Sequence, residues 1–248
     1  MPSATLHRTD MRLALASGLI ACASASPALA QYAGGASATR GAGREERRGG
    51  LSWSDGDPVL RGSILMPVAE GLSIEGAATS LWGSDRHGDA DAVIDLGAVF
   101  AQQIGGWNLS AEGRYHLFPG ASGQGYGEIG AGAAFLIGPA SVDLSANYAP
   151  RQSAIGGDNL YLSASAAVGV PGTPLTVSAR IGRSSGDVRD PVRAARLRPD
   201  GAYWDHGVNI DYLKGRWFAG LRYADSSIDG PGSRHAGATL IGRVGLNL

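Results

Sequence analysis

Cysteine and lysine are almost absent from this chain of 248 residues, which contains one of each, Cys22 and Lys214. A single cysteine excludes an internal disulfide. Charged residues make up only 17%, and basic and acidic side chains nearly balance at 21 and 22, so no electrostatic feature suggests a nucleic-acid partner. No apolar run reaches the roughly 18 residues of a membrane-spanning helix, which excludes a helical membrane protein.

Glycine is the residue in excess, at 39 of 248 residues, which is about twice its average frequency. Glycine at this density disfavours helices, and here it is mixed with apolar residues without a collagen repeat. We therefore expect an all-β chain with many turns, and the length suits one domain or at most two. Glycines within strands would permit bending and leave room for large neighbours.

Residues 1–30 have the features of a secretory signal peptide. A charged start precedes an apolar run at 13–23, and an A-x-A site ends at Ala30. Such a signal peptide would direct export, and its cleavage after Ala30 would remove Cys22, leaving no cysteine for a nucleophilic or metal site. As an alternative, the residues leading to Cys22 resemble a lipoprotein box, which would acylate this cysteine.

From Pro58 onward, apolar and polar residues alternate with a period of two, in runs of about ten residues. The run 107–117 is the clearest. Strands of this length match the roughly 9 to 11 residues with which a tilted strand crosses a bilayer. Eleven strands are predicted, at 59–68, 72–82, 92–102, 107–117, 126–137, 141–149, 159–169, 175–183, 203–213, 216–225 and 238–248.

The connections alternate between short and long, which places every long loop on one side and Leu248 on the side of the short turns. Outer-membrane barrels have short periplasmic turns and long extracellular loops. An even strand count requires a twelfth strand before Pro58, and the candidate is 42–53, although its charges at 44–48 would not tolerate lipid. The predicted organisation is a signal peptide at 1–30, an N-terminal segment with this first strand at 31–57, and an antiparallel transmembrane β-barrel of about twelve strands at 58–248.

The alternation alone does not say whether the apolar face points outward, because a soluble lipocalin-like barrel has the same period with an apolar interior. Aromatic residues near both ends of this face favour the membrane, where they form girdles at the interfaces. The last strand, with Leu248 at its end, resembles the signal read by the barrel-assembly machinery. The predicted girdles are Trp82, Tyr115, Tyr148, Trp204 and Tyr223 beside the long loops, and Phe100, Trp107, Phe135, Tyr212 and Trp217 beside the short turns.

The opposite face would line a lumen that contains seven acids and five arginines. Arginine can pair with several carboxylates at once, so these side chains suit either a network that stiffens a closed barrel or a slightly cation-preferring path for small polar solutes. The predicted lining residues are Arg61, Glu75, Asp95, Glu112, Arg114, Glu128, Asp143, Arg180, Asp205, Asp211, Arg222 and Arg243.

The search for catalytic residues gives no convincing constellation. His116 would lie near Glu112 with Ser110 on the same face, but a histidine at a barrel rim is more often a hydrogen-bonding group. We therefore expect no enzymatic activity, catalytic residue, metal site or cofactor. The arginines of the loop 184–202 and its border could contact lipopolysaccharide, fold inward as a constriction, or simply be solvated; they are Arg183, Arg189, Arg193, Arg196 and Arg198.

The segment 48–62, RGGLSWSDGDPVLRG, resembles the opening of the TorF-type porins of proteobacteria. The Pro-Gly loop after Tyr115 and the strand end at 148–150 are also similar to that family. The resemblance implies an outer-membrane barrel that acts as a porin and has no established catalytic residues. The expected partners are outer-membrane lipid, lipopolysaccharide, the barrel-assembly machinery and small polar solutes. The alternatives are a non-conducting structural or adhesive barrel and a soluble periplasmic ligand-binding barrel.

Overall fold

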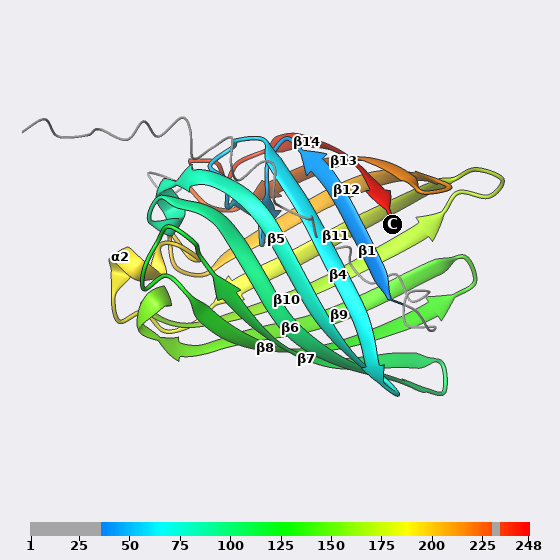
Figure 1. Ribbon diagram of the computed structural model, residues 1–248, viewed down its shortest axis with the longest axis horizontal. Coiled ribbons are helices and arrows are strands. Elements are labelled where there is room, and N and C mark those ends of the chain that lie inside the picture. Colours follow the sequence, from blue (N-terminus) through cyan, green and yellow to red (C-terminus); the bar gives the residue numbers. More distant parts are fainter. Residues whose placement is uncertain (1–35, 230–233) are drawn as a thin grey trace, which may run out of the picture.

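Twelve antiparallel strands close into a barrel in the computed structural model, which describes residues 36–229 and 234–248 (Figure 1). The signal peptide predicted at 1–30 lies outside the described residues. The barrel strands are β1 (Ser37–Gly43), β4 (Val59–Ala69), β5 (Leu72–Ser84), β6 (Ala90–Ile104), β7 (Trp107–Leu117), β8 (Tyr126–Ile137), β9 (Ala140–Gln152), β10 (Gly157–Gly169), β11 (Leu175–Ser185), β12 (Tyr203–Lys214), β13 (Trp217–Ser226) and β14 (Thr239–Asn247).

The predicted all-β barrel is confirmed, and so are eleven of its strands. β7 and β8 have the predicted bounds, and each of the other nine ends within three residues of them. Each barrel strand from β4 to β14 pairs with its neighbour in the chain, and β1 pairs with both β4 and β14. The period-two pattern was sufficient here because a wall with two chemically different faces strongly fixes the position of each strand.

The predicted position of the first strand is wrong. β1 covers Ser37–Gly43, so that only the first two residues of the predicted range 42–53 belong to it. The charged run 44–48 therefore lies beyond the strand. It leads into a small separate hairpin formed by β2 (Arg47–Arg48) and β3 (Leu51–Ser52).

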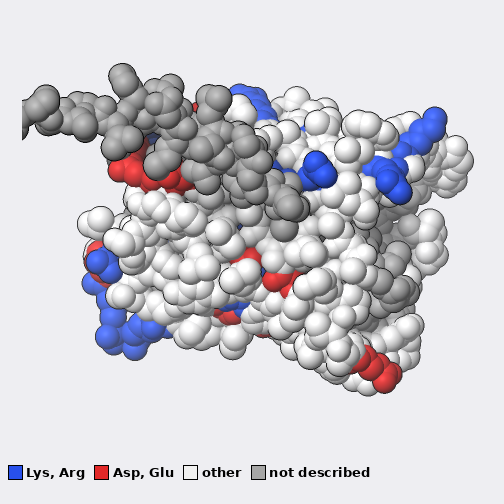
Figure 2. Space-filling model, in the orientation of Figure 1, with Lys and Arg blue, Asp and Glu red and all other residues white. Residues whose placement is uncertain are grey.

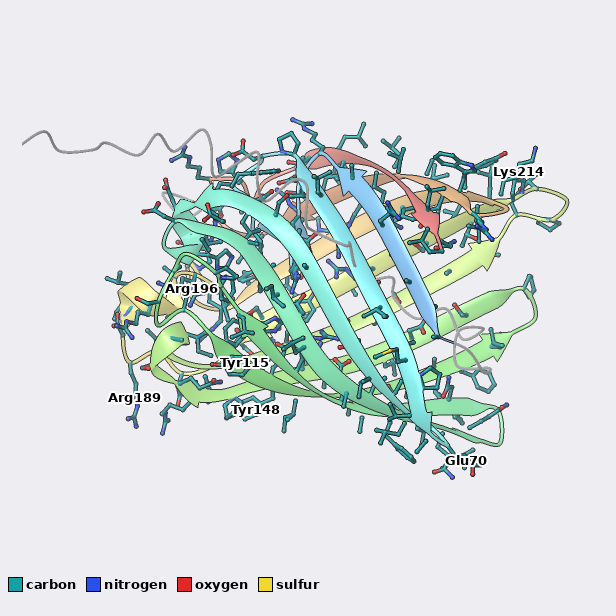
Figure 3. All side chains as sticks on the ribbon, in the orientation of Figure 1. Glu70, Tyr115, Tyr148, Arg189, Arg196 and Lys214 are labelled. Atoms are coloured by element: carbon teal, nitrogen blue, oxygen red, sulfur yellow. The ribbon has the colours of Figure 1, made fainter. Side chains whose placement is uncertain are left out.

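The long connections all lie at one end of the barrel and the short turns at the other; four of these turns have two residues and the turn 170–174 has five. Figure 3 shows Arg189 and Arg196 at the first end, and Glu70 and Lys214 at the second. The short helical pieces belong to the long connections: η2 (Asp85–His87), η3 (Ser153–Ile155) and α2 (Pro191–Ala194). No helix in the described ranges is long and apolar enough to cross a membrane. We call the half of the barrel interior next to the long connections the long-loop half, and the half next to the short turns the short-turn half.

The outer face of the wall is apolar. On the face seen in Figure 2, uncharged residues cover most of the surface, and basic residues gather toward the ends. Alternate residues of each strand expose large apolar side chains, such as Leu109 on β7 and Leu221 on β13. Eight of the ten aromatic residues predicted for the girdles are exposed, whereas Trp82 and Phe135 are half-buried.

Candidate functional site

The connection between β1 and β4, residues 44–58, enters the long-loop half of the barrel, and we call it the plug segment. Its Arg48 guanidinium binds the carboxylate of Asp95 on β6, with Nη2 and Oδ2 2.7 Å apart. Its Gly49 carbonyl accepts a hydrogen bond of 2.6 Å from the hydroxyl of Tyr203 on β12. Because β6 and β12 are on opposite sides of the strand order, the plug segment reaches across the interior.

The hairpin at the tip of the plug segment depends on two adjacent glycines. Gly49 and Gly50 have φ angles of 51° and 77°, the left-handed conformations required at both central positions of a two-residue turn. A Cβ atom on Gly50 would lie 2.5 Å from the Cβ of Asp205. The tip therefore approaches the wall more closely than a residue with a side chain would allow.

Ion pairs hold one side of the plug segment. The carboxylate of Glu46 lies 2.9 Å from Arg48 Nε and 2.7 Å from Nη1 of Arg61 on β4. Glu46 is almost completely buried, and Asp95 is also buried. Buried carboxylates require such partners, because removing a charge from water without one is unfavourable by several kcal/mol. The run of both signs at 45–48 thus pairs largely within the interior instead of facing lipid.

On the other side, Arg47 binds main-chain oxygens. Its guanidinium donates to the carbonyls of Ala224 at 3.1 Å, Gly237 at 2.8 Å and His235 at 3.0 Å. Ala224 belongs to β13, and the other two precede β14. One side chain therefore ties the plug segment to two further parts of the molecule.

Apolar packing completes the long-loop half. Trp53 of the plug segment is buried, with its ring 4.6 Å from that of His87 and 5.9 Å from that of Phe118, and with the Arg48 guanidinium 4.3 Å from its centre. This half is packed like the core of a globular protein. The cluster is formed by Leu51, Trp53, Leu81, Ala90, Val93, Phe118, Tyr126, Ala149, Ala154, Ile155, Leu197, Tyr203, Ile228 and Ala236.

Two loop residues, His87 and Arg196, form a buried pair at the edge of this core. Arg196 Nη2 lies 3.1 Å from His87 Nδ1, and Arg196 Nη1 donates to the Ala154 carbonyl at 2.6 Å. Burial, together with the charge of Arg196, lowers the pKa of His87 well below its usual value. Burial also lowers the pKa of Arg196 to about 10. His87 is therefore neutral at pH 7, with Nδ1 accepting the hydrogen bond.

Of the outcomes considered for the arginines of the loop 184–202, the structure shows two. Arg196 and Arg198 fold inward and are buried, and Arg198 donates to the carbonyls of Asp158 and Gly186, both at 2.6 Å. Arg189 and Arg193 are exposed. The loop thus covers the end of the barrel with two of its arginines, and exposes Arg189 and Arg193 on its surface.

On the wall formed by β5 to β8, one arginine holds a group of acids on neighbouring strands. The Arg114 guanidinium lies 2.7 Å from Glu75, 3.2 Å from Glu112 and 3.6 Å from Glu128. His116 joins this group to the plug segment: its Nδ1 lies 2.6 Å from Asp95 and its Nε2 3.3 Å from Glu128. Among the residues predicted to line the lumen, Arg61 also contacts the plug segment, through its ion pair with Glu46.

The strands on the other side contain the remaining predicted residues. Arg180 on β11 lies 2.9 Å from Asp205 on β12, and Arg243 on β14 lies 2.7 Å from Asp211 on β12. On β13, Arg222 forms no ion pair or hydrogen bond with any described residue. Asp143 stands apart on β9, where it accepts a hydrogen bond from Ser141 at 3.4 Å. The twelve predicted residues thus fall into separate groups rather than into one site.

Among the described residues, nothing around His116 forms a nucleophile site. Its nearest polar atoms are carboxylate oxygens, and Ser110, which the sequence places on the same face, pairs with Gly132 on β8, whereas His116 pairs with Tyr126, three strand periods away. The part of the chain that the structure describes also contains no group of three or more His, Cys, Asp or Glu arranged to hold a metal ion.

Sequence reasoning missed Glu46, Arg48, Trp53 and His87, which build the long-loop half. The signals were present: opposite charges within 45–48, followed by two glycines and an apolar pair at 51 and 53. Together they indicate a tight hairpin with one charged side and one apolar side, which fits an interior better than a membrane-facing wall.

Residues 43–241 match the family described as "Bacterial protein of unknown function (Gcw_chp)". The chain belongs to the Gcw_chp family. The match begins at the last residue of β1, so it contains the whole plug segment and most of the barrel. A search of curated proteins gives no match.

Two solved porin structures are similar to this Gcw_chp chain in fold. The NanC porin has a TM-score of 0.58 at 11% identity, over 85% of this chain and 98% of the porin. The KdgM porin has a TM-score of 0.55 at 10% identity, over 86% and 98%. At this identity the likeness concerns the barrel architecture alone.

Proposed function

We propose that this chain is a bacterial outer-membrane barrel of the porin type that passes small polar solutes. The observation that carries the proposal is the contrast between the two faces of the wall: exposed apolar side chains outside, and paired charges inside a closed ring. A closed barrel satisfies its backbone hydrogen bonds without edges, which a membrane requires. The resemblance to TorF-type porins and the fold of the NanC and KdgM porins support the same proposal.

In the proposed path, the charged groups of the short-turn half are the lining, and the plug segment is the barrier. The lining is accessible to water there, since the Arg243 and Asp211 side chains remain 42% and 33% exposed. The long-loop half is packed, so solute passage requires the plug segment to leave its position between β6 and β12. Passage is non-enzymatic in this proposal, because transport through a polar lumen needs no catalytic group.

The proposed surroundings follow from the outer surface. Lipid chains would contact the apolar wall, and the exposed Arg189 and Arg193 at the long-loop end suit the anionic groups of lipopolysaccharide. On β14, Leu240 and Val244 face outward, as expected for a strand presented to the barrel-assembly machinery.

The second candidate is a barrel that does not conduct and acts as a structural or adhesive element. The packing of Leu51 and Trp53 against both walls favours it, because these buried side chains fill the long-loop half as far as the described residues show. The two candidates differ in one property, namely whether the plug segment can be displaced while the barrel remains intact.

Conductance across planar bilayers separates them. We would compare the wild-type protein with the double variant Arg48→Gln/Trp53→Ala, which weakens the plug segment, and with Arg216→Gln in an exposed short turn as a control. A porin predicts current steps that are more frequent or larger in the double variant and unchanged in the control. If the double variant keeps its β-sheet circular dichroism spectrum and gives no steps, the porin proposal fails and the non-conducting barrel stands.

A further inference from the structure

Arg222 differs from the other charged residues of the barrel interior because it lacks a partner among the described residues. It lies at the middle of β13, between the exposed side chains of Leu221 and Tyr223, so its own side chain points inward. Its Nε is buried without a hydrogen-bond partner. A guanidinium offers five donors, and leaving them unused in a partly buried position is unfavourable.

The neighbouring acids are already occupied. Asp205 is completely buried and accepts hydrogen bonds from Arg180 at 2.9 Å and from the Tyr161 hydroxyl at 2.8 Å. Asp211 binds Arg243 at 2.7 Å. Glu46 of the plug segment binds Arg48 and Arg61, as described above. None of these carboxylates is therefore free to neutralise Arg222.

The charges that act most strongly on Arg222 leave a local positive excess. Arg180 and Arg243 repel its charge, while Glu46 and Asp205, each engaged by other cations, attract it. On the wall itself, three arginines on β11, β13 and β14 face the interior with two acids, Asp205 and Asp211. The third nearby acid, Glu46 of the plug segment, is already shared by Arg48 and Arg61, so the positive excess remains. On the opposite side, Arg114 is the single arginine beside three glutamates.

We propose that Arg222, flanked by Arg180 and Arg243, is a binding subsite for a small oxyanion, a carboxylate or a phosphate. The proposal rests on the proposed function, since it names the class of solute that the path would accept. The planar guanidinium fork matches the two oxygens of a carboxylate or phosphate. The side chains of Arg243 and Asp211 are partly exposed while the plug segment is in place, so this wall has space for water beside the proposed subsite.

The proposal reverses the charge preference that a count of lining residues suggests. Seven acids against five arginines indicate a path that slightly prefers cations, but the acids are largely consumed by pairing with arginines, including Arg48 of the plug segment. What an incoming solute meets on the β11–β14 wall is the unpaired cation. The preference therefore depends on which charges are satisfied, not on their number.

The test measures binding to the folded, detergent-solubilised full chain, without any conductance. Acetate and inorganic phosphate would each be titrated by isothermal calorimetry at constant ionic strength into the wild type, Arg222→Gln and the control Arg216→Gln. We expect saturable binding of at least one anion to the wild type and the control, and at least a tenfold loss of affinity in Arg222→Gln. A response to acetate alone would assign a carboxylate subsite, and a response to phosphate alone a phosphate subsite.

Equal affinity in Arg222→Gln and the wild type would overturn the proposal, and so would the absence of saturable binding in the wild type. Because Arg222 has no partner to lose, its replacement should leave the fold intact, and an unchanged circular dichroism spectrum would verify this. In any variant that conducts, Arg222→Gln should also shift the reversal potential in a salt gradient toward cation preference. A barrel that binds anions but never conducts would refute the porin proposal while leaving the subsite in place.

Discussion

The two halves of the barrel interior are enclosed by the same strands but are filled in different ways. In the long-loop half, Trp53 and Leu51 pack against residues from both walls, and the acids Glu46 and Asp95 are buried. In the short-turn half, the ion pair between Arg243 and Asp211 remains partly exposed. The difference comes from the plug segment, so the alternating pattern of the strands determines the wall but not the contents of the barrel.

The largest difference between the halves should appear when an aromatic side chain is removed from each. Trp53→Ala should lower the free energy of unfolding by about 3–5 kcal/mol, because it leaves a cavity among His87, Phe118 and the Arg48 guanidinium. The matched change in the short-turn half is Phe218→Ala, whose ring is half-buried over Gly41. Urea titrations in the same detergent would measure both. Equal losses would remove the distinction between a packed half and an open half.

The second comparison concerns arginines. Arg48→Gln should destabilise the protein by about 3 kcal/mol, since it removes the arginine that Glu46 and Asp95 share and leaves these buried carboxylates with one partner each, Arg61 and His116. Arg243→Gln should have an effect of at most about 1 kcal/mol, because this arginine is 42% exposed against 22% for Arg48. Thermal unfolding followed by circular dichroism gives the ranking. A larger effect for Arg243→Gln would contradict the burial that distinguishes the halves.

The third effect is a dependence of the protein's stability on pH, which arises from His87 at the long-loop end. The folded state holds His87 neutral with its pKa below about 6.5, the unfolded value, so unfolding takes up a proton as the pH falls through 6.5. Stability should decrease by up to about 1.4 kcal/mol per pH unit below 6.5 and level off below the folded pKa. His87→Gln should remove this part of the dependence. Urea unfolding of the wild type and of His87→Gln at a series of pH values measures the difference, and identical profiles would contradict it.

The smallest change in stability is expected for Arg114, at the centre of the acidic group. Arg114→Gln should lower the free energy of unfolding by about 1 kcal/mol, because the three glutamates near it keep access to water. In a conducting variant, its loss should move the reversal potential toward cation preference, and Arg114→Lys should restore most of the original value. An unchanged potential would show that this group lies outside the solute path.

The strands could be predicted from the sequence because each has an apolar and a polar face. β1 was placed too late in the chain because Ser37–Gly43 is short and consists mainly of small residues, so it has little alternation to detect. The charges at 45–48 were weighed only against lipid, whereas the structure provides a third environment, the barrel interior, where Glu46 binds Arg48 and Arg61.

The contacts of the candidate site also divide into those that the sequence predicts and those that it does not. The cluster of Arg114 with Glu112 and Glu128 follows from the register of neighbouring strands, and alternation alone places these three residues on one face. The pair of Arg48 with Asp95 joins a loop to a strand far along the chain, and no local pattern specifies such a pair. That Arg222 lacks a partner among the described residues emerges only from the arrangement of the charges in space.

The plug segment also bridges the seam at which the ring closes. It follows β1 directly, and β1 pairs with β14, so the seam joins the first and last strands of the described chain. Arg44 donates to the carbonyl of Leu240 at 3.1 Å, and Arg47 to that of Gly237, both on the far side of the seam. The segment that fills the interior therefore also holds together the two strands at which the ring closes, so a change that loosens it should weaken the closure of the wall as well.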